Sequence, residues 1–327
     1  MTDVARLAGV SEMTVSNAFR RPDRVTESTR RRVLDASQHL GYVLNEVAGN
    51  LASGKSKVIV AIVPSLSSSY FHAALQGTMD ELRKGDYQVM LADSGYAPQD
   101  EQRVVAAFLG RRPDGFLLTG TRHTRKTVAM LRAAAVPIVE TWEVDGPFID
   151  MGVGYANYEA AAQLTQLVVS KGHREIGYID HPESTVKRHR QRRDGIRKTL
   201  ERAGLRHDRV VSLPEVMGFR GGRVGLTELL TAWPEITAVI AATDVYAAGA
   251  IFESHRRGFK VPDDMAICGF GNAEVGRELD PPLTTIDIRS YEMGRVAARL
   301  LLARLSGHPP EQTSVDVGFE VIERESL

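Results

Sequence analysis

The stretch DVARLAGVSEMTVSNAF at residues 3–19, followed after a short break by TESTRRRVLDASQHLGY at residues 26–42, predicts three short helices. Gly9 ends the first helix, because glycine adopts a left-handed backbone conformation without a steric penalty. Ser11 and Thr26 are good N-caps for the second and third helices, since their hydroxyls can accept a hydrogen bond from an N–H of the first turn. The head of the chain is therefore expected to be all-α.

The apolar residues of this head predict a miniature core. They recur at helical spacing and comprise Val4, Ala5, Ala8, Val10, Val15, Val33, Ala36 and Leu40. Two helices joined by a tight glycine turn form a helix-turn-helix, whose second helix fits the major groove of DNA. The side chains that this helix would turn outward are Glu12, Met13, Thr14, Ser16 and Asn17. A small helical cap with solvated polar faces is the alternative for the same pattern.

Charge is distributed unevenly along a chain that is neutral overall. Lys+Arg and Asp+Glu number 41 each in 327 residues. Residues 1–57 hold nine basic and six acidic side chains, a net +3, and residues 58–327 hold 32 and 35, a net −3. A mildly basic head on a mildly acidic body is compatible with phosphate contact by the head.

The cysteine count and the hydropathy pattern restrict the protein class. Cys268 is the only cysteine, so an internal disulfide or a thiolate metal cage is excluded, and a reducing cytoplasm is the expected compartment. The sequence has no apolar run of about 18 residues and does not begin like a signal peptide. No cofactor or metal is expected.

Residues 43–57, VLNEVAGNLASGKSK, separate the head from the body. They are too short and too small-sided to bury a core, so a plain linker is one interpretation. The other is a segment that becomes ordered only on a partner. Leu51 would then be an apolar wedge that enters the minor groove between base steps.

Residues 58–327 predict an α/β body with two similar halves. Continuous apolar strands alternate with helices, a pattern typical of parallel sheets covered on both faces. The strands are expected at 58–63, 87–93, 115–119 and 137–141, then at 175–180, 209–213, 238–243 and 265–270, and finally at 283–288 and 315–322. Two doubly wound lobes follow from this order. Ligands of such sheets bind beyond the carboxyl ends of the strands, which places a ligand in the cleft between the lobes.

These motifs resemble the lac/gal repressor family of bacterial transcription regulators. Besides the head, the similarity is carried by PSLSSSYF, KGHREIGYI, RRDGI, TDVYAAGA, GFKVPDDMAICGF and PPLTTIDI, in the family's order and over essentially the whole chain. Within the family, YQVMLADSGY, TRHTRKT and VPIVETWEVDGPFIDMGVGYANYEAAAQLT are similar to the gluconate-utilisation repressors.

The resemblance implies a domain organisation. A helix-turn-helix DNA-binding domain would occupy residues 1–42, a hinge helix and linker 43–57, and an effector-binding and dimerisation domain 58–327. That last domain would have two lobes of the periplasmic-binding-protein type. Lobe one would contain about 58–172 and 289–311, and lobe two about 173–288 and 312–327.

The resemblance also implies a homodimer on a palindromic operator, with two recognition helices in successive major grooves. Glu12, Met13 and Asn17 fall at base-reading positions, and Thr14 and Ser16 fall where hydroxyls meet phosphate or base edges. Asn can pair with adenine, Glu can accept from cytosine, and Met can touch a thymine methyl group. Ala48 and Leu51 would lie in the hinge helix, in the minor groove. No terminal leucine heptad is present, so dimers are expected and not tetramers.

By the same resemblance, a small effector would bind between the lobes. The positions that match the family's effector site are Ser67, Ser69, Tyr70, Phe71, Arg192, Phe219, Thr243 and Asp244. Three family carboxylate positions hold other residues: Gly271, Ala156 in Ala156-Asn157, and Trp142. Removing acids while keeping Arg192 favours an anionic effector, because an arginine can pair bidentately with a carboxylate. Gluconate or a related sugar acid is the first expectation.

Some questions stay open at this point. YVLN at 42–45 replaces the family's YxPN, and the chain starts almost at the first helix, so a native start upstream of Met1 stays open. The operator sequence, the regulated genes and whether the effector releases or promotes DNA binding are not encoded in a recognisable pattern.

Two rival classes have weaker support. A solute-binding protein of a sugar transport system would share the two-lobed body, but the helix-turn-helix and the missing signal peptide oppose it.

An enzyme on a doubly wound fold is opposed by GVGYAN and GFGNAE, which lack the third glycine of a dinucleotide-binding loop. His181, His189 and His207 are interpreted as solvated surface residues and not as metal ligands.

Overall fold

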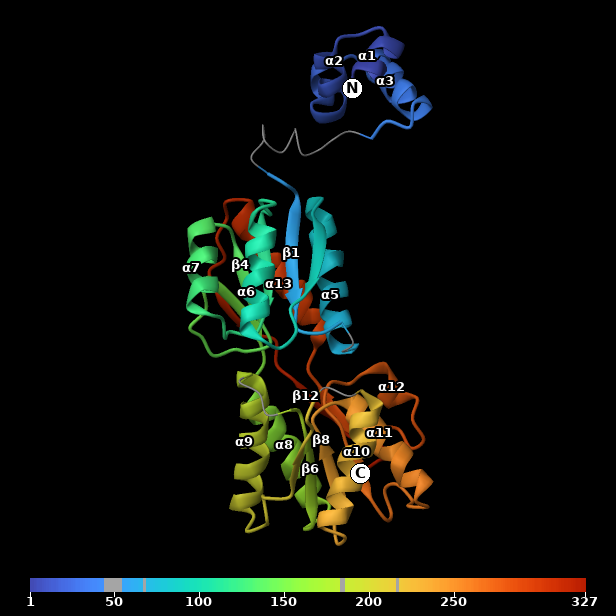
Figure 1. The fold of residues 1–327 in the computed structure, drawn as a ribbon, viewed down its shortest axis with the longest axis vertical. Coiled ribbons are helices and arrows are strands. Elements are labelled where there is room, and N and C mark those ends of the chain that lie inside the picture. The colour runs from blue at the N-terminus through green and yellow to red at the C-terminus, as the bar shows by residue number, and fades with distance from the viewer. Residues whose placement is uncertain (44–54, 67–68, 183–185, 216–217) are drawn as a thin grey trace. The chain divides into compact units, whose positions relative to one another are not determined.

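The computed structural model describes residues 1–43, 55–66, 69–182, 186–215 and 218–327, and for Ser69 and Tyr70 the backbone alone (Figure 1). The chain forms two compact units, Met1–Ser56 and Lys57–Leu327. Each unit has a hydrophobic core of its own.

The first unit contains the three predicted helices, α1 (Thr2–Ala8), α2 (Glu12–Arg20) and α3 (Glu27–His39), with a 3-10 turn at Pro22–Arg24. Gly9 ends α1 in the left-handed conformation, with φ 64°. The Ser11 hydroxyl accepts a hydrogen bond from the Thr14 N–H at 3.2 Å, and the Thr26 hydroxyl accepts one from the Thr29 N–H at 3.3 Å. The predicted caps are therefore confirmed.

The core of this unit agrees with the predicted apolar set except at one position. Its buried members are Val4, Ala5, Ala8, Val15, Ala18, Val33 and Ala36. Leu40 was expected in this core, and that prediction is wrong, because its side chain is 45% exposed. The helix α3 ends at His39, so Leu40 lies beyond its last turn, and Tyr42 packs against the core instead.

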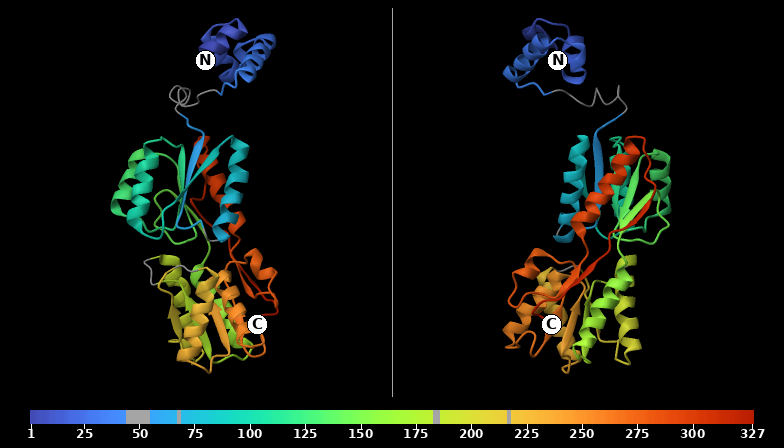
Figure 2. Two further views of the ribbon diagram at one scale, coloured as in Figure 1. Left: turned by 45° about the vertical axis from the view of Figure 1, so that its right-hand side comes forward. Right: turned by 180° about the vertical axis from the view of Figure 1, so that it is seen from behind.

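The first sheet of the second unit is entirely parallel. Its strands are, in spatial order, β11 (Ser314–Asp316), β5 (Met151–Gly154), β4 (Ile138–Thr141), β3 (Gly115–Thr119), β1 (Val58–Val63) and β2 (Gln88–Asp93). The helices α6 (Pro98–Leu109) and α7 (Arg125–Ala134) cover one face (Figure 2). The other face is covered by α5 (Ser69–Leu82), which continues into a 3-10 turn at Arg83–Gly85, and by α13 (Ser290–Leu305).

The second sheet has the same plan with fewer strands. Its parallel order is β7 (Val210–Ser212), β6 (Ile176–Asp180), β8 (Ala238–Ala241) and β9 (Ala266–Cys268). The helices α8 (Asn157–Ser170) and α9 (Lys187–Arg202) pack together, as do α10 (Phe219–Ala232) and α11 (Asp244–Arg256). A short helix, α12 (Glu274–Arg277), follows β9. The predicted pair of doubly wound lobes is confirmed.

The expected single strand at 315–322 is two strands that belong to different sheets. β11 pairs with β5 in the first sheet, whereas β12 (Glu320–Ile322) pairs antiparallel with β10 (Thr285–Asp287). Gly318, with φ 70°, lies in the turn between them. Residues 312–327 were expected in lobe two, but β11 lies in lobe one, so the chain changes lobes only after Asp316. β5 was not predicted.

In the second lobe, the helices α10 and α11 approach each other closely at two glycines. A Cβ added at Gly222 in α10 would lie 1.8 Å from the Tyr246 carbonyl oxygen of α11. A Cβ added at Gly249 in α11 would lie 2.0 Å from the Phe219 carbonyl oxygen. The two backbones therefore touch, and neither position has room for a side chain.

We predict that Gly222→Ala destabilises the body. Overpacking costs about 1–3 kcal/mol, and each kcal/mol shifts the melting temperature of a large domain by ~2–4 °C. Gly110→Ala is the matched control, since its Cβ would meet only the Ala107 oxygen at 3.5 Å. Calorimetry that finds the same melting temperature for both variants would contradict the close packing.

A buried histidine joins three elements of lobe one. The His123 ring, in the segment after β3, lies with Nδ1 2.7 Å from Glu101 Oε1 of α6 and Nε2 3.1 Å from Glu140 Oε1 of β4. Burial lowers the pKa of His123, but the hydrogen bonds and charges of both carboxylates outweigh it and raise the pKa to about 9. At neutral pH the ring is protonated and bridges the two acids.

The raised pKa of His123 predicts a pH-dependent part of the stability. This contribution is complete below the unfolded-state pKa of about 6.5 and is lost as the pH rises through about 9. Between about pH 6 and pH 10, the free energy of unfolding of the wild type should fall by ~2–3 kcal/mol more than that of His123→Gln. Urea denaturation measures both profiles, and parallel profiles would rule out the protonated bridge.

Candidate functional site

The outer face of α2 carries the residues predicted to read DNA. Val15 and Ala18 point into the head core. Glu12 is exposed and Met13 is 71% exposed. Thr14, Ser16 and Asn17 are half-buried. All five predicted residues therefore belong to one helix whose opposite side is fixed by the core.

Three predicted site residues lie outside the described residues. Ala48 and Leu51 fall within 44–54, and Ser67 falls within 67–68. Ser69 and Tyr70 form the start of α5, where only the backbone is described.

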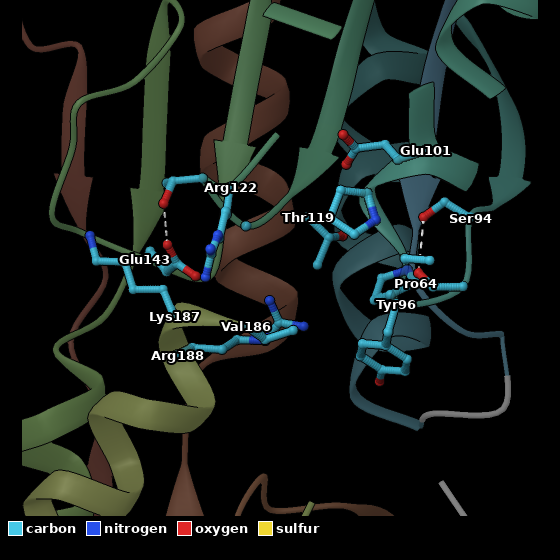
Figure 3. A pocket seen from close by; sticks show the side chains of 15 residues that line it. Pro64, Ser94, Tyr96, Glu101, Thr119, Arg122, Glu143, Val186, Lys187 and Arg188 are labelled. Carbon is cyan, nitrogen blue, oxygen red and sulfur yellow. Dashed lines mark hydrogen bonds between the residues drawn. The ribbon is translucent and has the colours of Figure 1, made fainter. Parts of the chain in front are cut away.

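The second unit has a pocket whose walls come from both lobes (Figure 3). Lobe one contributes the ends of β1, β2, β3 and β4, with Pro64, Ser94, Tyr96, Glu101, Thr119, Thr121, Arg122 and Glu143. Lobe two contributes the start of α9, with Val186, Lys187 and Arg188. The pocket therefore lies beyond the carboxyl ends of the strands, where the strand order places it.

Arg192 lies deeper along α9 and is 3% exposed. Its Nε donates to Asn157 Oδ1 at 2.9 Å, its Nη2 donates to the Tyr155 hydroxyl, and its guanidinium lies 4.0 Å from the ring centroid of Phe270. Within the described part of the chain, no carboxylate lies within 4.0 Å of its nitrogens. The arginine is thus held in place by neutral groups.

The sequence-based expectation that the cleft has lost its acids is wrong in one respect. Trp142 does replace a carboxylate, and its ring is buried edge-on against Phe71 at 5.0 Å. The next residue, Glu143, lines the pocket and accepts a hydrogen bond from the Thr121 hydroxyl. The Trp142 backbone is left-handed, with φ 80°, and sequence periodicity does not reveal such a turn. The carboxylate of the pocket therefore lies one position later in the sequence than the family pattern places it.

His181 and His189 were expected on the surface, and this expectation is also wrong. Both are buried, and their rings stack 4.2 Å apart. Burial and the charges of Arg192 and Arg188 lower the pKa of His181 to about 3. Burial, the neighbouring His181 and Arg188 also lower the pKa of His189. The two imidazoles are therefore neutral at physiological pH. His207 is exposed, as expected.

The remaining predicted effector residues do not line this pocket. Thr243 caps α11 by accepting from the Tyr246 N–H at 3.2 Å. Asp244 is buried and accepts from the Ala273 N–H at 2.5 Å and from the Thr285 hydroxyl. Burial, only partly offset by these hydrogen bonds, raises the pKa of Asp244 to about 6.

Phe219 and Phe71 are also separate from the pocket. Phe219 begins α10, is 47% exposed and contacts Phe252 at a centroid distance of 6.0 Å. Phe71 belongs to the lobe-one core, beside Trp142. Of the predicted effector residues, Arg192 is the one that belongs to the helix whose start forms the lobe-two wall of this pocket.

Sequence reasoning missed several residues of the pocket, above all Glu143, Arg122, Tyr96 and Arg188. Arg188 could have been found, since it precedes Arg192 by four positions and therefore shares its helix face. Across the described ranges, no group of three or more His, Cys, Asp or Glu side chains is arranged to hold a metal ion. None of the helices in the described part of the chain combines the length and apolar character of a membrane span.

Comparison with known proteins covers both units. Residues 1–45 match the family described as bacterial regulatory proteins, lacI family, and residues 165–327 match the periplasmic binding protein-like domain. The HTH-type transcriptional regulator GntR of Escherichia coli K12 is 33% identical over 321 residues, 98% of this chain and 96% of that protein. The regulator IdnR of the same strain is 29% identical and covers 100% of this chain and 98% of its own length.

Solved structures agree with this assignment. A LacI-family transcriptional regulator from Silicibacter pomeroyi superposes with a TM-score of 0.92 at 30% identity, over 99% of this chain and 98% of that chain. The transcription regulator GntR from Chromobacterium violaceum has a TM-score of 0.79 at 29% identity, over 82% and 98%. The lac repressor dimer bound to operator shares the fold, with a TM-score of 0.85 at 23% identity over 99% and 97%.

With a helix-turn-helix head, two doubly wound lobes and full-length relatives that are transcriptional regulators, the chain belongs to the lacI family of bacterial regulatory proteins.

Proposed function

We propose that this regulator binds a palindromic operator as a homodimer and represses genes for sugar-acid utilisation until an anionic effector enters the cleft. The observation that carries the effector class is Arg192, a buried guanidinium with neutral partners and no described carboxylate within 4.0 Å. A buried cation without a counter-ion favours an anionic ligand. Regulators named GntR among the relatives support a gluconate-like acid.

Glu143 lines the pocket whose lobe-two wall is the start of α9 and gives it a second chemical property. A carboxylate accepts hydrogen bonds only, and sugar hydroxyls can donate them. A ligand with hydroxyls at Glu143 and a carboxylate at Arg192 would satisfy both groups. A structurally similar regulator, CelR, was solved in complex with cellobiose, at 28% identity and a TM-score of 0.73. A neutral sugar is therefore the competing effector class, and the acid is favoured here because of Arg192.

The control mechanism follows from the position of the cleft. An effector that contacts both lobes would stabilise one lobe arrangement over another, and the dimer would transmit this difference to the paired heads through residues 43–57. The effector can shift DNA binding only by its difference in affinity for the two arrangements. As a DNA-binding regulator, the protein would act in the cytoplasm. A solute-binding role is disfavoured by the match of residues 1–45 to the lacI family of regulatory proteins.

We predict that Asn17→Ala weakens specific operator binding by about 1–3 kcal/mol, because an asparagine pair with a base edge is lost. Binding to an unrelated duplex should change little, since phosphate contacts dominate there. Gln38→Ala, on the exposed side of α3, is the matched control. Fluorescence anisotropy with both duplexes measures the effect. Equal losses on specific and unrelated DNA would argue against base reading by Asn17.

We predict that Arg192→Gln weakens binding of D-gluconate by about 2–5 kcal/mol, the range measured when one partner of a buried charge pair is truncated. Arg190→Gln removes the same charge from the exposed side of α9 and should leave the affinity unchanged. Calorimetric titration of the full chain measures both, and thermal melting verifies that each variant is folded. Tight binding of an uncharged hexose, with no response to acids, would overturn the anionic class.

A further inference from the structure

Arg188 is a second buried cation on the same face of α9. It precedes Arg192 by four positions, a spacing that places the two Cβ atoms about 5–6 Å apart. Arg188 is 3% exposed and lines the pocket. In Figure 3 its side chain extends from the start of α9 toward the middle of the pocket, below Glu143 and Arg122 in the view.

Arg188 has no binding partner among the residues that the structure describes: no hydrogen bond and no ion pair joins its guanidinium to them. Two other charged residues near the start of α9, Lys187 and Arg193, have partners. Lys187 Nζ donates to the Asp145 carbonyl at 2.6 Å, and Arg193 Nε donates to Asp180. A cation that lines a pocket and has no partner in the protein gains from a ligand that supplies the opposite charge.

Lobe one makes room for this side chain. Gly120 follows β3 with φ 86°, and a Cβ there would lie 3.2 Å from Arg188 Nη1. The Arg188 head therefore rests against the loop of lobe one. The Arg192 head instead stacks on Phe270 of lobe two, 4.0 Å from its ring centroid. Because the two heads lie against different lobes, we expect one carboxylate to pair with only one of them.

The acids nearby do not neutralise Arg188. Glu143 is bound by the Thr121 hydroxyl, and Glu101 is paired with His123. Neither carboxylate lies within 4.0 Å of the Arg188 nitrogens, since no such ion pair is found among the described residues. His181, whose pKa is lowered by burial and then by the charges of Arg192 and Arg188, has both ring nitrogens buried without a hydrogen-bond partner in the described chain.

We propose that the cleft takes a sugar acid with two separate anionic groups, one paired with Arg192 and the other with Arg188. This inference rests on the proposed function and narrows its ligand class to aldaric acids or phosphorylated aldonic acids. The shared chemistry is a second negative charge at the far end of a polyhydroxylated chain. Arg188 is then the residue that distinguishes dianions from monoanions.

Titration calorimetry of the full chain tests this with three probes. D-Gluconate carries one carboxylate, D-glucarate carries a second one in place of the terminal hydroxymethyl group, and gluconate 6-phosphate carries a phosphate there. At least one dianion should bind at least about tenfold more tightly than gluconate. The identity of that dianion shows whether the second anionic group is a carboxylate or a phosphate. Arg188→Gln should remove that preference by lowering the affinity for the preferred dianion about tenfold or more.

Arg190→Gln is the matched control, because it removes one charge from the exposed side of the same helix turn. It should keep the preference for dianions. The comparison of the three probes on the wild type needs no variant, so a folding defect in Arg188→Gln cannot obscure it. Equal affinities of the wild type for gluconate and both dianions would overturn the two-charge inference and leave an anionic effector intact. No binding of any of these acids would overturn the proposed function itself.

Discussion

Two arginines buried on one face of α9 set the chemistry of the cleft. Removing a cation from water is costly unless an opposite charge or several hydrogen bonds compensate. Arg192 is compensated by neutral groups, and Arg188 has no partner in the described chain. Under the proposed function, a ligand that supplies negative charge would stabilise the body. A Cβ at Gly120 of lobe one would lie 3.2 Å from Arg188 Nη1 of lobe two, so this arginine lies where the two lobes approach each other.

A ligand in the cleft can control DNA binding only if it binds one arrangement of the two lobes more tightly than another. The head and the body have separate cores, and the buried side of α2 packs only within the head core. Under the proposed function, an effector would act on how two heads are held in a dimer and not on the fold of either head. The free energy available for regulation is the difference between the ligand's affinities for the two lobe arrangements.

Sequence patterns that involve a few neighbouring residues predicted more of this structure than patterns that depend on contacts between distant residues. The Ser11 cap and the alternation of apolar strands with helices are encoded within a few residues, and they are confirmed. The segment 315–322 was expected to be one strand, because strand propensity does not reveal which sheet a strand joins. Glu143 was missed because the left-handed backbone of Trp142 determines which residue meets the cleft. His181 looked solvated in sequence, since its burial depends on packing against distant elements.

The central claim is that the head binds a twofold-symmetric duplex and that an acid in the cleft adjusts this binding. Selection of bound sites from random DNA by the full chain, with and without D-gluconate, D-glucarate or gluconate 6-phosphate, tests it most directly. We expect one palindromic site whose recovery changes in the presence of at least one acid and not with neutral hexoses. Recovery of no symmetric site, or of a site indifferent to every acid, would contradict the account.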